Sequence, residues 1–299
     1  MLHRAKRLLI AAAIGLMIGL PAASWLVAEG ALHIRERPKP EPRLAQTVAD
    51  SADATWEPVE IAAADGTPLS GWIFTPEHPN GAAVILLHGV GDTRAGSLAV
   101  ADFLLCSGFT TLTPDVRGHG ASGGDVISYG IRETGDVHAW ADWLLAHRPV
   151  QRLYGWGASM GAAILLQSLP VEPRFRALVA DSPFATFDEI AHDRLAQHTG
   201  LWPQAFGPIV HLGFGYARLR YGLDLQRAAP IDSIRTTNVP ILLIHGANDH
   251  NIPAHHSREL HAANPRTVLW EVPGAGHVQS YATDPQEYAS RVVAWFQIH

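Results

Sequence analysis

The stretch that decides the fold of this chain is Gly157-Ala158-Ser159-Met160-Gly161. A serine between two glycines at this spacing is typical of a nucleophile held on a sharp turn between a strand and a helix. Glycine is needed on each side because a side chain two residues before or after the serine would collide with the neighbouring strand or helix. The pattern also arises by chance, so the flanking sequence must support it.

The residues on both sides favour this interpretation. Arg152-Leu153-Tyr154-Gly155-Trp156 is an apolar and aromatic run of strand character, and residues 162–169 are strong helix formers. The predicted order is therefore strand, turn, helix. Ser159 becomes a candidate nucleophile, and a serine hydroxyl needs a general base, normally a histidine, to take its proton as it attacks.

The chain has 17 histidines, and position favours His277 as the base. Residues 267–272 predict a strand, and His277 follows it after Pro273-Gly274-Ala275-Gly276. In an open parallel sheet the carboxyl ends of all strands lie on the same side, so residues distant in sequence can meet there. We therefore expect His277 to reach Ser159.

An acid is expected to orient the histidine, and two aspartates are candidates. Asp249 lies just beyond a buried strand predicted at residues 241–244, followed by His245-Gly246. Asp181 also follows a predicted strand, at residues 177–180. Either aspartate gives the chain order of serine, acid and histidine that is described for one class of serine enzymes. Asp249 is preferred for its surroundings, a strand that ends in His245-Gly246 and a loop that continues with Asn251-Ile252-Pro253, which look like the usual acid loop of that class. Asp181 stays open as the alternative.

The motifs together resemble the α/β-hydrolase-fold serine hydrolases, within them the group of small esterases, monoacylglycerol-lipase-like enzymes and serine aminopeptidases. The resemblance covers the chain from about Trp56 to the C-terminus. It implies an α/β fold with a mostly parallel central sheet flanked by helices. It rests on five motifs in order: Leu86-Leu87-His88-Gly89-Val90-Gly91, Asp115-Val116-Arg117-Gly118-His119-Gly120, the serine turn, His245-Gly246 through Asp249, and Gly274 through His277.

The resemblance implies a serine ester hydrolase that works through an acyl-enzyme intermediate. Ser159 would be the nucleophile, His277 the general base and Asp249 the orienting acid, with the backbone N–H groups of Val90 and Met160 forming the oxyanion hole. No metal and no cofactor is implied. A serine peptidase with the same triad is the alternative, and a non-catalytic binding protein of this fold is the third hypothesis.

Residues 184–234 are too long for a simple connection between strands and predict a small helical cap over the active site. Four aromatic residues there are candidates to line an apolar acyl pocket, although aromatic residues at such spacing more often pack between cap and core: Trp202, Phe206, Phe214 and Tyr216. The expected substrate is a small-molecule ester or lipid-like compound with an apolar acyl group. A peptidase would instead need carboxylates beside the cap for a free amine, for which Asp188, Glu189 and Asp193 are the candidates.

The N-terminal residues 1–33 predict a membrane segment. Residues 8–28 are uncharged and almost wholly apolar, and Arg4, Lys6 and Arg7 stand before them. A retained anchor with the catalytic domain outside the cytoplasm is preferred over a signal segment cleaved near Ala22-Ala23-Ser24, which would give a secreted protein. Residues 34–55, which contain three prolines, would form a semi-extended spacer before a hydrolase domain at residues 56–299.

Composition excludes other classes of function. The formal net charge is −6, and no basic patch with interleaved aromatic residues is present, so nucleic acid is not an expected partner. A single cysteine excludes an internal disulfide. Four neighbouring histidines invite a metal site, but no cysteine accompanies them and their spacing is not His-Glu-x-x-His, so a solvent-facing helix is expected instead: His250, His255, His256 and His261.

Overall fold

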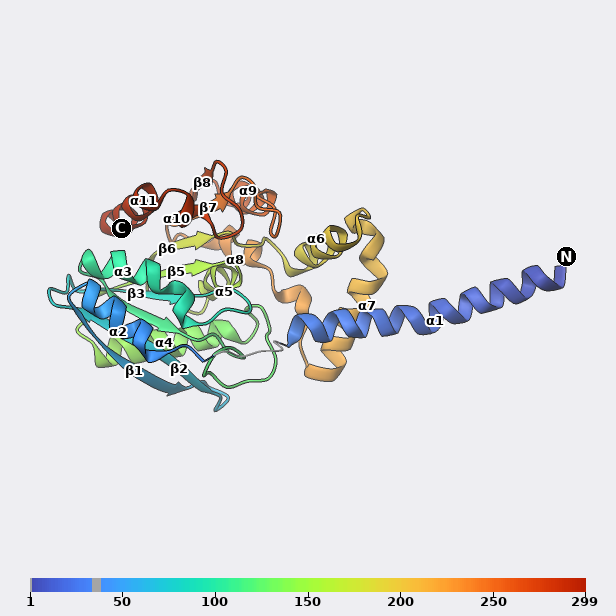
Figure 1. The fold of residues 1–299 in the computed structure, drawn as a ribbon, viewed down its shortest axis with the longest axis horizontal. Helices are drawn as coiled ribbons and strands as arrows, with labels where there is room; N and C mark the ends of the chain where they lie inside the picture. Colours follow the sequence, from blue (N-terminus) through green and yellow to red (C-terminus); the bar gives the residue numbers. More distant parts are fainter. Residues whose placement is uncertain (1, 34–38) are drawn as a thin grey trace.

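The computed structural model describes residues 2–33 and 39–299 (Figure 1). At its centre is an eight-stranded sheet of order β1-β2-β4-β3-β5-β6-β7-β8. Strand β2 is antiparallel to its two neighbours, and the other neighbouring pairs are parallel. The strands are β1 Ala54–Ala62, β2 Pro68–Pro76, β3 Ala82–Leu87, β4 Thr110–Pro114, β5 Arg152–Ala158, β6 Phe175–Asp181, β7 Ile241–Gly246 and β8 Val268–Val272. The four strands predicted above, at residues 152–156, 177–180, 241–244 and 267–272, are confirmed as β5, β6, β7 and β8.

Strand β3 shows how the sheet divides the core into two layers. All six of its residues are buried, and they alternate between the two faces because successive side chains of a strand point in opposite directions. Ala83, Ile85 and Leu87 join one hydrophobic cluster, while the intervening Ala82, Val84 and Leu86 join the other. A strand buried on both faces reads as a continuous apolar run, which is what residues 82–87 are.

Helices cover both faces of the sheet. Helices α3 (Leu98–Cys106) and α11 (Pro285–Ile298) pack on the face of Val84, and α4 (Glu133–His147), α5 (Met160–Ser168), α8 (Pro230–Thr236) and α9 (His255–Ala263) pack on the face of Ile85. A short helix α10 (Ser280–Thr283) ends before α11 because Asp284 caps the new helix through the Glu287 N–H, with Pro285 at its first position.

The segment of residues 184–234, called the cap segment below, is helical. It contains α6 (Phe187–Thr199) and α7 (Gly207–Tyr221), with short 3-10 turns at Pro203–Phe206 and Leu225–Arg227. Both helices stand off the carboxyl end of the sheet, whereas α8 at the end of the segment packs against α5 and α9 (Figure 1). The helical character of this segment is as predicted.

In the part of the chain that the structure describes, no helix combines the length and the apolar character needed to cross a membrane. The membrane anchor predicted for residues 1–33 is therefore wrong. The localisation drawn from it, an anchored domain outside the cytoplasm or a secreted protein, falls with it.

The N-terminal residues form one long helix, α1 (Leu2–Leu32), whose second half docks on the cap segment (Figure 1). Ala28 and Leu32 are buried against protein, and Gly213 of α7 lies beside α1, where the position of a Cβ would be 3.4 Å from the Ser24 carbonyl oxygen. Ala28 and Leu32 therefore serve helix packing, whereas Trp25 and Leu26 of the same half are exposed.

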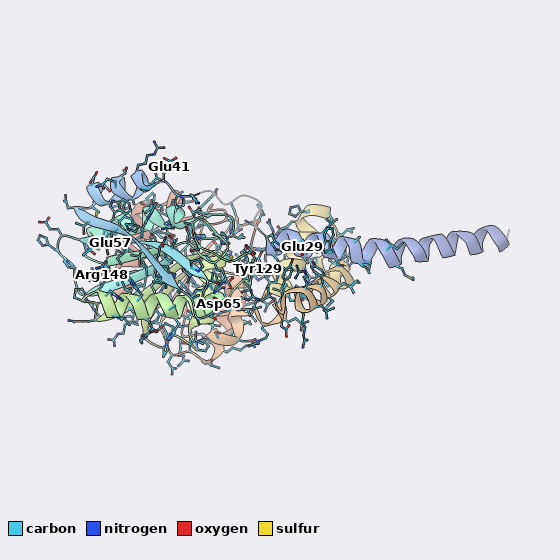
Figure 2. All side chains as sticks on the ribbon, turned by 90° about the horizontal axis from the view of Figure 1, so that it is seen from below. Glu29, Glu41, Glu57, Asp65, Tyr129 and Arg148 are labelled. Atoms are coloured by element: carbon cyan, nitrogen blue, oxygen red, sulfur yellow. The ribbon has the colours of Figure 1, made fainter. Side chains whose placement is uncertain are left out.

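Polar contacts fix the end of α1 in place. Glu29 accepts hydrogen bonds of 2.6 Å from the hydroxyls of both Tyr216 and Tyr221 of α7. The Tyr129 hydroxyl donates to the Ala31 carbonyl at 2.7 Å, and Figure 2 shows Glu29 and Tyr129 at this junction. The hydrogen bonds from the two tyrosines lower the pKa of Glu29, so the charged carboxylate is the favoured acceptor.

The extended spacer predicted for residues 34–55 is wrong over much of its length. Residues 34–38 lie outside the described chain, but Pro42–Ser51 forms helix α2, with proline at its first position where a missing N–H costs nothing. Its buried Ala45 and Ala49 pack with Trp72 and Phe74 of β2. Strand β1 then begins at Ala54, close to the predicted start of the domain.

Candidate active site

Ser159 lies on the turn between β5 and α5, as its flanking sequence predicts. Its backbone is left-handed, with φ 54° and ψ −117°, a conformation that is strained for a residue with a side chain. A Cβ on Gly157 would lie 2.6 Å from the Ala162 nitrogen, and one on Gly161 would lie 2.3 Å from the Leu87 carbonyl oxygen. Both glycines are therefore required by the close packing of strand and helix around the turn.

The structure brings together the three residues predicted to form a triad. His277 Nε2 lies 2.9 Å from Ser159 Oγ, and His277 Nδ1 lies 2.7 Å from Asp249 Oδ2. Because the carboxylate can only accept, Nδ1 carries the proton and Nε2 is free to accept from the serine hydroxyl. Ser159 is 5% exposed and the His277 side chain 19%, so both residues are largely shielded from solvent.

The carboxylate of Asp249 is fully buried and well supplied with donors. Its Oδ1 accepts the N–H groups of Asn251 (2.8 Å) and Ile252 (2.9 Å). A second imidazole, that of buried His245, places Nε2 3.3 Å from Oδ2. Burial alone raises the pKa of Asp249, but the hydrogen bonds from His245 and His277 outweigh it and hold the pKa well below its usual range. The acid is thus ionised beside His277.

Asp181, the alternative acid, has other partners. The Ser182 hydroxyl donates to its Oδ1 and the Tyr288 hydroxyl to its Oδ2, both at 2.9 Å. The residue is buried at the end of β6, and this burial raises the pKa of its carboxyl group. Asp181 makes no hydrogen bond to His277, whose Nδ1 is directed at Asp249. The geometry therefore favours Asp249.

The two predicted oxyanion donors flank Ser159. Met160 begins α5, where the helix dipole favours negative charge, and Val90 follows Gly89, whose position for a Cβ is only 3.3 Å from the Ser159 Cβ. Within residues 2–33 and 39–299, neither the Met160 nor the Val90 N–H donates to a protein acceptor. Two unpaired backbone donors beside a serine are what an oxyanion hole requires.

Two buried histidines hold the loop that carries Val90. The Nδ1 of His88 bonds the Gly89 carbonyl (2.8 Å) and its Nε2 accepts the Val116 N–H (3.0 Å), so His88 holds the loop as expected. His119 does the same from the neighbouring loop: Nδ1 bonds the Arg117 carbonyl (3.0 Å) and Nε2 accepts the Gly91 N–H (3.2 Å). Accepting at Nε2 requires both rings to be neutral.

This arrangement predicts acid sensitivity. Burial, and then the nearby His88, lower the pKa of His119 from 6.5 to about 4. Between about pH 6.5 and about pH 4, His119 of the unfolded chain is protonated and His119 of the folded protein is not. The free energy of unfolding therefore falls by roughly 3 kcal/mol as the pH is lowered through this range. His119→Gln keeps an acceptor but cannot titrate. In urea unfolding at about pH 7 and pH 4, we expect the variant to lose correspondingly less stability than the wild type. Equal losses would contradict the role assigned to His119.

A cavity of about 580 Å³ opens directly onto Ser159 and is lined mainly by apolar side chains. Of the four predicted pocket residues, only Phe214 lines it. Trp202 is 68% exposed, Phe206 is buried in the main core, and the Tyr216 hydroxyl binds Glu29. The other three aromatic candidates therefore pack against protein or face solvent. The prediction that they line the pocket is wrong.

Most walls of the cavity come from three helices. The chain around Ser159 adds Val90, Met160, Tyr129, Phe184 and Ile252. The sequence could not predict that α1 lines the cavity, because an apolar helix has the same kind of sequence whether lipid or protein covers it. The helical lining residues are Val27, Ala28, Gly30 and Ala31 of α1; Phe187, Ile190, Ala191, Arg194, Leu195 and His198 of α6; and Ile209, Val210, Gly213 and Phe214 of α7.

The histidine cluster near the start of α9 differs from its prediction. His250 is exposed, but His256 is fully buried and His255 is half-buried, and both face α6. The expected solvent-facing helix is therefore wrong for these two residues. Their partners on α6 are Glu189 and Asp193, two of the carboxylates considered for amine binding, and neither lines the cavity.

Comparison with known proteins agrees with this fold. A family model described as the alpha/beta hydrolase family matches residues 84–291, more than half of the chain. The Bacillus subtilis protein YqkD is 29% identical over 239 residues, which are 78% of this chain and 76% of YqkD. The Escherichia coli protein YfhR is 28% identical over 237 residues, 76% of this chain and 75% of YfhR. Both relatives carry the description "uncharacterized protein".

Among solved structures, the Pyrococcus furiosus esterase Pf2001 superposes with a TM-score of 0.69 at 25% sequence identity, covering 89% of this chain and 98% of that protein. An esterase from Exiguobacterium antarcticum has a TM-score of 0.61 at 18% identity and covers 80% and 99%, which shows the shared fold. The fold and the family match define an α/β-hydrolase-fold hydrolase. The chain belongs to the alpha/beta hydrolase family.

Proposed function

We propose that this protein is a serine ester hydrolase that works through an acyl-enzyme intermediate. The observation that carries the proposal is the hydrogen-bonded chain from Ser159 Oγ through His277 to Asp249, at 2.9 Å and 2.7 Å, at the floor of an apolar cavity. A serine is a useful nucleophile only when a base takes its proton and an acid orients that base. The structural similarity to the Pyrococcus furiosus esterase supports the same reaction class.

In the proposed reaction, Ser159 Oγ attacks the ester carbonyl carbon while His277 Nε2 takes the hydroxyl proton. The tetrahedral intermediate carries its negative charge on the former carbonyl oxygen, which the N–H groups of Val90 and Met160 stabilise. The intermediate collapses, and the leaving alcohol takes the proton from His277. Water then repeats the sequence on the acyl-enzyme, releases the acid and restores Ser159.

The substrate class follows from the cavity beside Ser159. Its walls are mainly apolar side chains and backbone from α1, α6 and α7, with Arg194 and His198 as polar members, so an apolar acyl chain gains most from entering it. An ester of a medium-chain or lipid-derived acid fits this description. The peptidase alternative is less well supported, because Glu189 and Asp193 face the histidines of α9 and are not among the residues that line the cavity. A non-catalytic binding protein would not need the intact chain of three side chains.

The test is hydrolysis of p-nitrophenyl esters of graded chain length by the wild type and by Gly30→Leu. Gly30 of α1 lines the cavity, and a Cβ there meets nothing within 4 Å, so leucine adds bulk to the wall without a local clash. We expect kcat/KM of the wild type to rise with acyl length. In Gly30→Leu, kcat/KM for the long esters should fall about tenfold or more while the acetate ester is little affected.

Gly19→Leu is the matched control. Gly19 is exposed on the same helix, also has free space for a Cβ, and does not line the cavity. Its chain-length profile should match that of the wild type. Absence of hydrolysis at every chain length would count against the ester hydrolase, whereas an unchanged profile in Gly30→Leu would reject α1 as a wall of the acyl site.

A further inference from the structure

The lining of the cavity beside Ser159 is uneven in charge. Among the described residues that line it there is no aspartate and no glutamate, but there is one arginine, Arg194 of α6. A guanidinium group is always protonated in a protein. The cavity wall therefore carries one permanent positive charge, and no acidic side chain of the same wall balances it.

The other titratable side chains of this wall are engaged in contacts within the protein. His33 Nδ1 lies 3.3 Å from the carboxylate of Glu29, and the Tyr129 hydroxyl donates to a backbone carbonyl group of α1 at 2.7 Å. His198 Nδ1 donates to the Arg194 carbonyl oxygen at 2.7 Å, so the Nε2 of the neutral ring is an acceptor and does not bind an anion. Arg194 is therefore the side chain of this wall to which an anionic group would bind.

Neutral groups hold the Arg194 guanidinium in place. Its Nη1 donates to the side-chain amide oxygens of Gln197, at 3.3 Å, and of Asn251 in the loop that follows Asp249. An amide oxygen orients the guanidinium but leaves its charge uncompensated. In the part of the chain that the structure describes, no carboxylate pairs with Arg194, and neither its Nε nor its Nη2 has an acceptor. These two nitrogens form an edge that can bind a carboxylate through two parallel hydrogen bonds.

Arg194 lies where the cavity meets solvent. The residue is exposed, whereas Ile190 and Ala191, one turn earlier on α6, give the cavity an apolar wall. Burial and the nearby Glu133 raise the pKa of the Tyr129 hydroxyl and the charge of Arg194 opposes them, so the guanidinium acts on the buried part of the cavity. An anionic group bound to Arg194 stays in contact with water, which avoids the cost of burying a charge, while an apolar chain attached to it lies in the cavity.

We propose that Arg194 makes this enzyme selective for amphipathic esters, which carry an apolar chain and one anionic oxygen group such as a carboxylate. This selectivity rests on the proposed ester hydrolase and defines its substrate class. The free edge of the guanidinium would bind the anionic group through two hydrogen bonds, and the apolar walls from α1, α6 and α7 would cover the chain. Arg194 determines which ester binds, whereas Ser159 and His277 cleave it.

The test compares kcat/KM for pairs of esters that differ in one charge, using the full-length wild type and Arg194→Gln. In the first pair the charge is on the acid: the p-nitrophenyl monoester of octanedioic acid and p-nitrophenyl octanoate. In the second pair it is on the alcohol: para-carboxyphenyl octanoate and para-carbamoylphenyl octanoate. In the pair whose carboxylate reaches Arg194, the variant should lower kcat/KM for the anionic ester relative to the neutral one by about fivefold or more. This size lies between the effects of an exposed ion pair and of a hydrogen bond to a charged group.

Two further variants separate charge from structure, and circular dichroism verifies the fold of each. Arg194→Lys keeps the charge but not the planar edge, so it should retain part of the selectivity. Arg218→Gln is the matched control, because Arg218 is an exposed arginine of α7 that does not line the cavity. Its ratios of anionic to neutral ester should equal those of the wild type.

Three results would overturn the proposed selectivity. Equal losses for both esters of each pair in Arg194→Gln would show that Arg194 only positions the loop of Asn251. A wild type that disfavours the anionic ester by about tenfold or more in both pairs would show that the carboxylate finds no partner, since an unpaired charge is costly to bury. Hydrolysis of none of the four esters by the wild type would reject the ester hydrolase itself, whereas the first two results leave that function standing.

Discussion

Replacing Ser159 with alanine is expected to lower kcat for p-nitrophenyl esters by about 10⁶-fold, the loss seen when a serine nucleophile is removed from a comparable triad. The methyl group of alanine cannot attack, so the acyl-enzyme does not form. The turn should survive, because the substitution removes only one oxygen and leaves Gly157 and Gly161 in place. Hydrolysis and labelling by a fluorophosphonate probe are the measurements, and Tm and circular dichroism show whether the fold is kept.

His277→Ala provides the internal comparison. Because the serine and the histidine act as one unit, the single variants and the double variant should lose activity to nearly the same extent. A double variant that is far worse than either single variant would indicate that the two residues act separately. Undiminished fluorophosphonate labelling of Ser159→Ala would place the nucleophile elsewhere.

The parts of this molecule that could be predicted are those that local sequence controls. A Cβ on Gly157 or Gly161 would lie less than 3 Å from backbone atoms, so five consecutive residues suffice to predict the serine turn. The strands follow from continuous apolar runs such as residues 82–87. Because β5, β7 and β8 are parallel, Ser159, Asp249 and His277 had to emerge at one edge of the sheet, and their meeting follows from topology.

The parts that could not be predicted depend on contacts between distant segments. Ser24, Ala28 and Leu32 of α1 are buried against protein, whereas Trp25 and Leu26 between them are exposed, and nothing in this composition distinguishes a helix docked on the cap segment from one buried in lipid. Tyr216 looked like a pocket residue, but its hydroxyl satisfies Glu29, which is 187 positions away in sequence. His256 is buried only because α6 lies over the start of α9, so its pairing with Asp193 is invisible until both helices are placed.

The choice between the two candidate acids gives the second large prediction. Asp249→Asn is expected to lower kcat by about 10⁴-fold. An amide in place of the carboxylate can turn its NH₂ toward His277, which favours the tautomer with the proton on Nε2, and this ring cannot accept the Ser159 proton. The ionised Asp249 also stabilises the charged imidazole during attack, and the low pKa of this carboxyl group keeps that charge at neutral pH.

Asp181→Asn should behave differently in the same assay. Burial raises the pKa of the Asp181 carboxyl group, which favours its neutral form. Its oxygens accept hydrogen bonds from Ser182 and Tyr288 and not from His277. A neutral amide of the same shape is therefore a close substitute for this carboxyl group. One of the two hydroxyls would then face an NH₂ group, and a lower Tm is expected together with kcat within about tenfold of the wild type. The decisive quantity is the loss of kcat in Asp249→Asn divided by the loss of kcat in Asp181→Asn. The Tm of each variant shows how much of its loss comes from reduced stability. A larger loss of kcat in Asp181→Asn than in Asp249→Asn would move the orienting acid from the end of β7 to the end of β6.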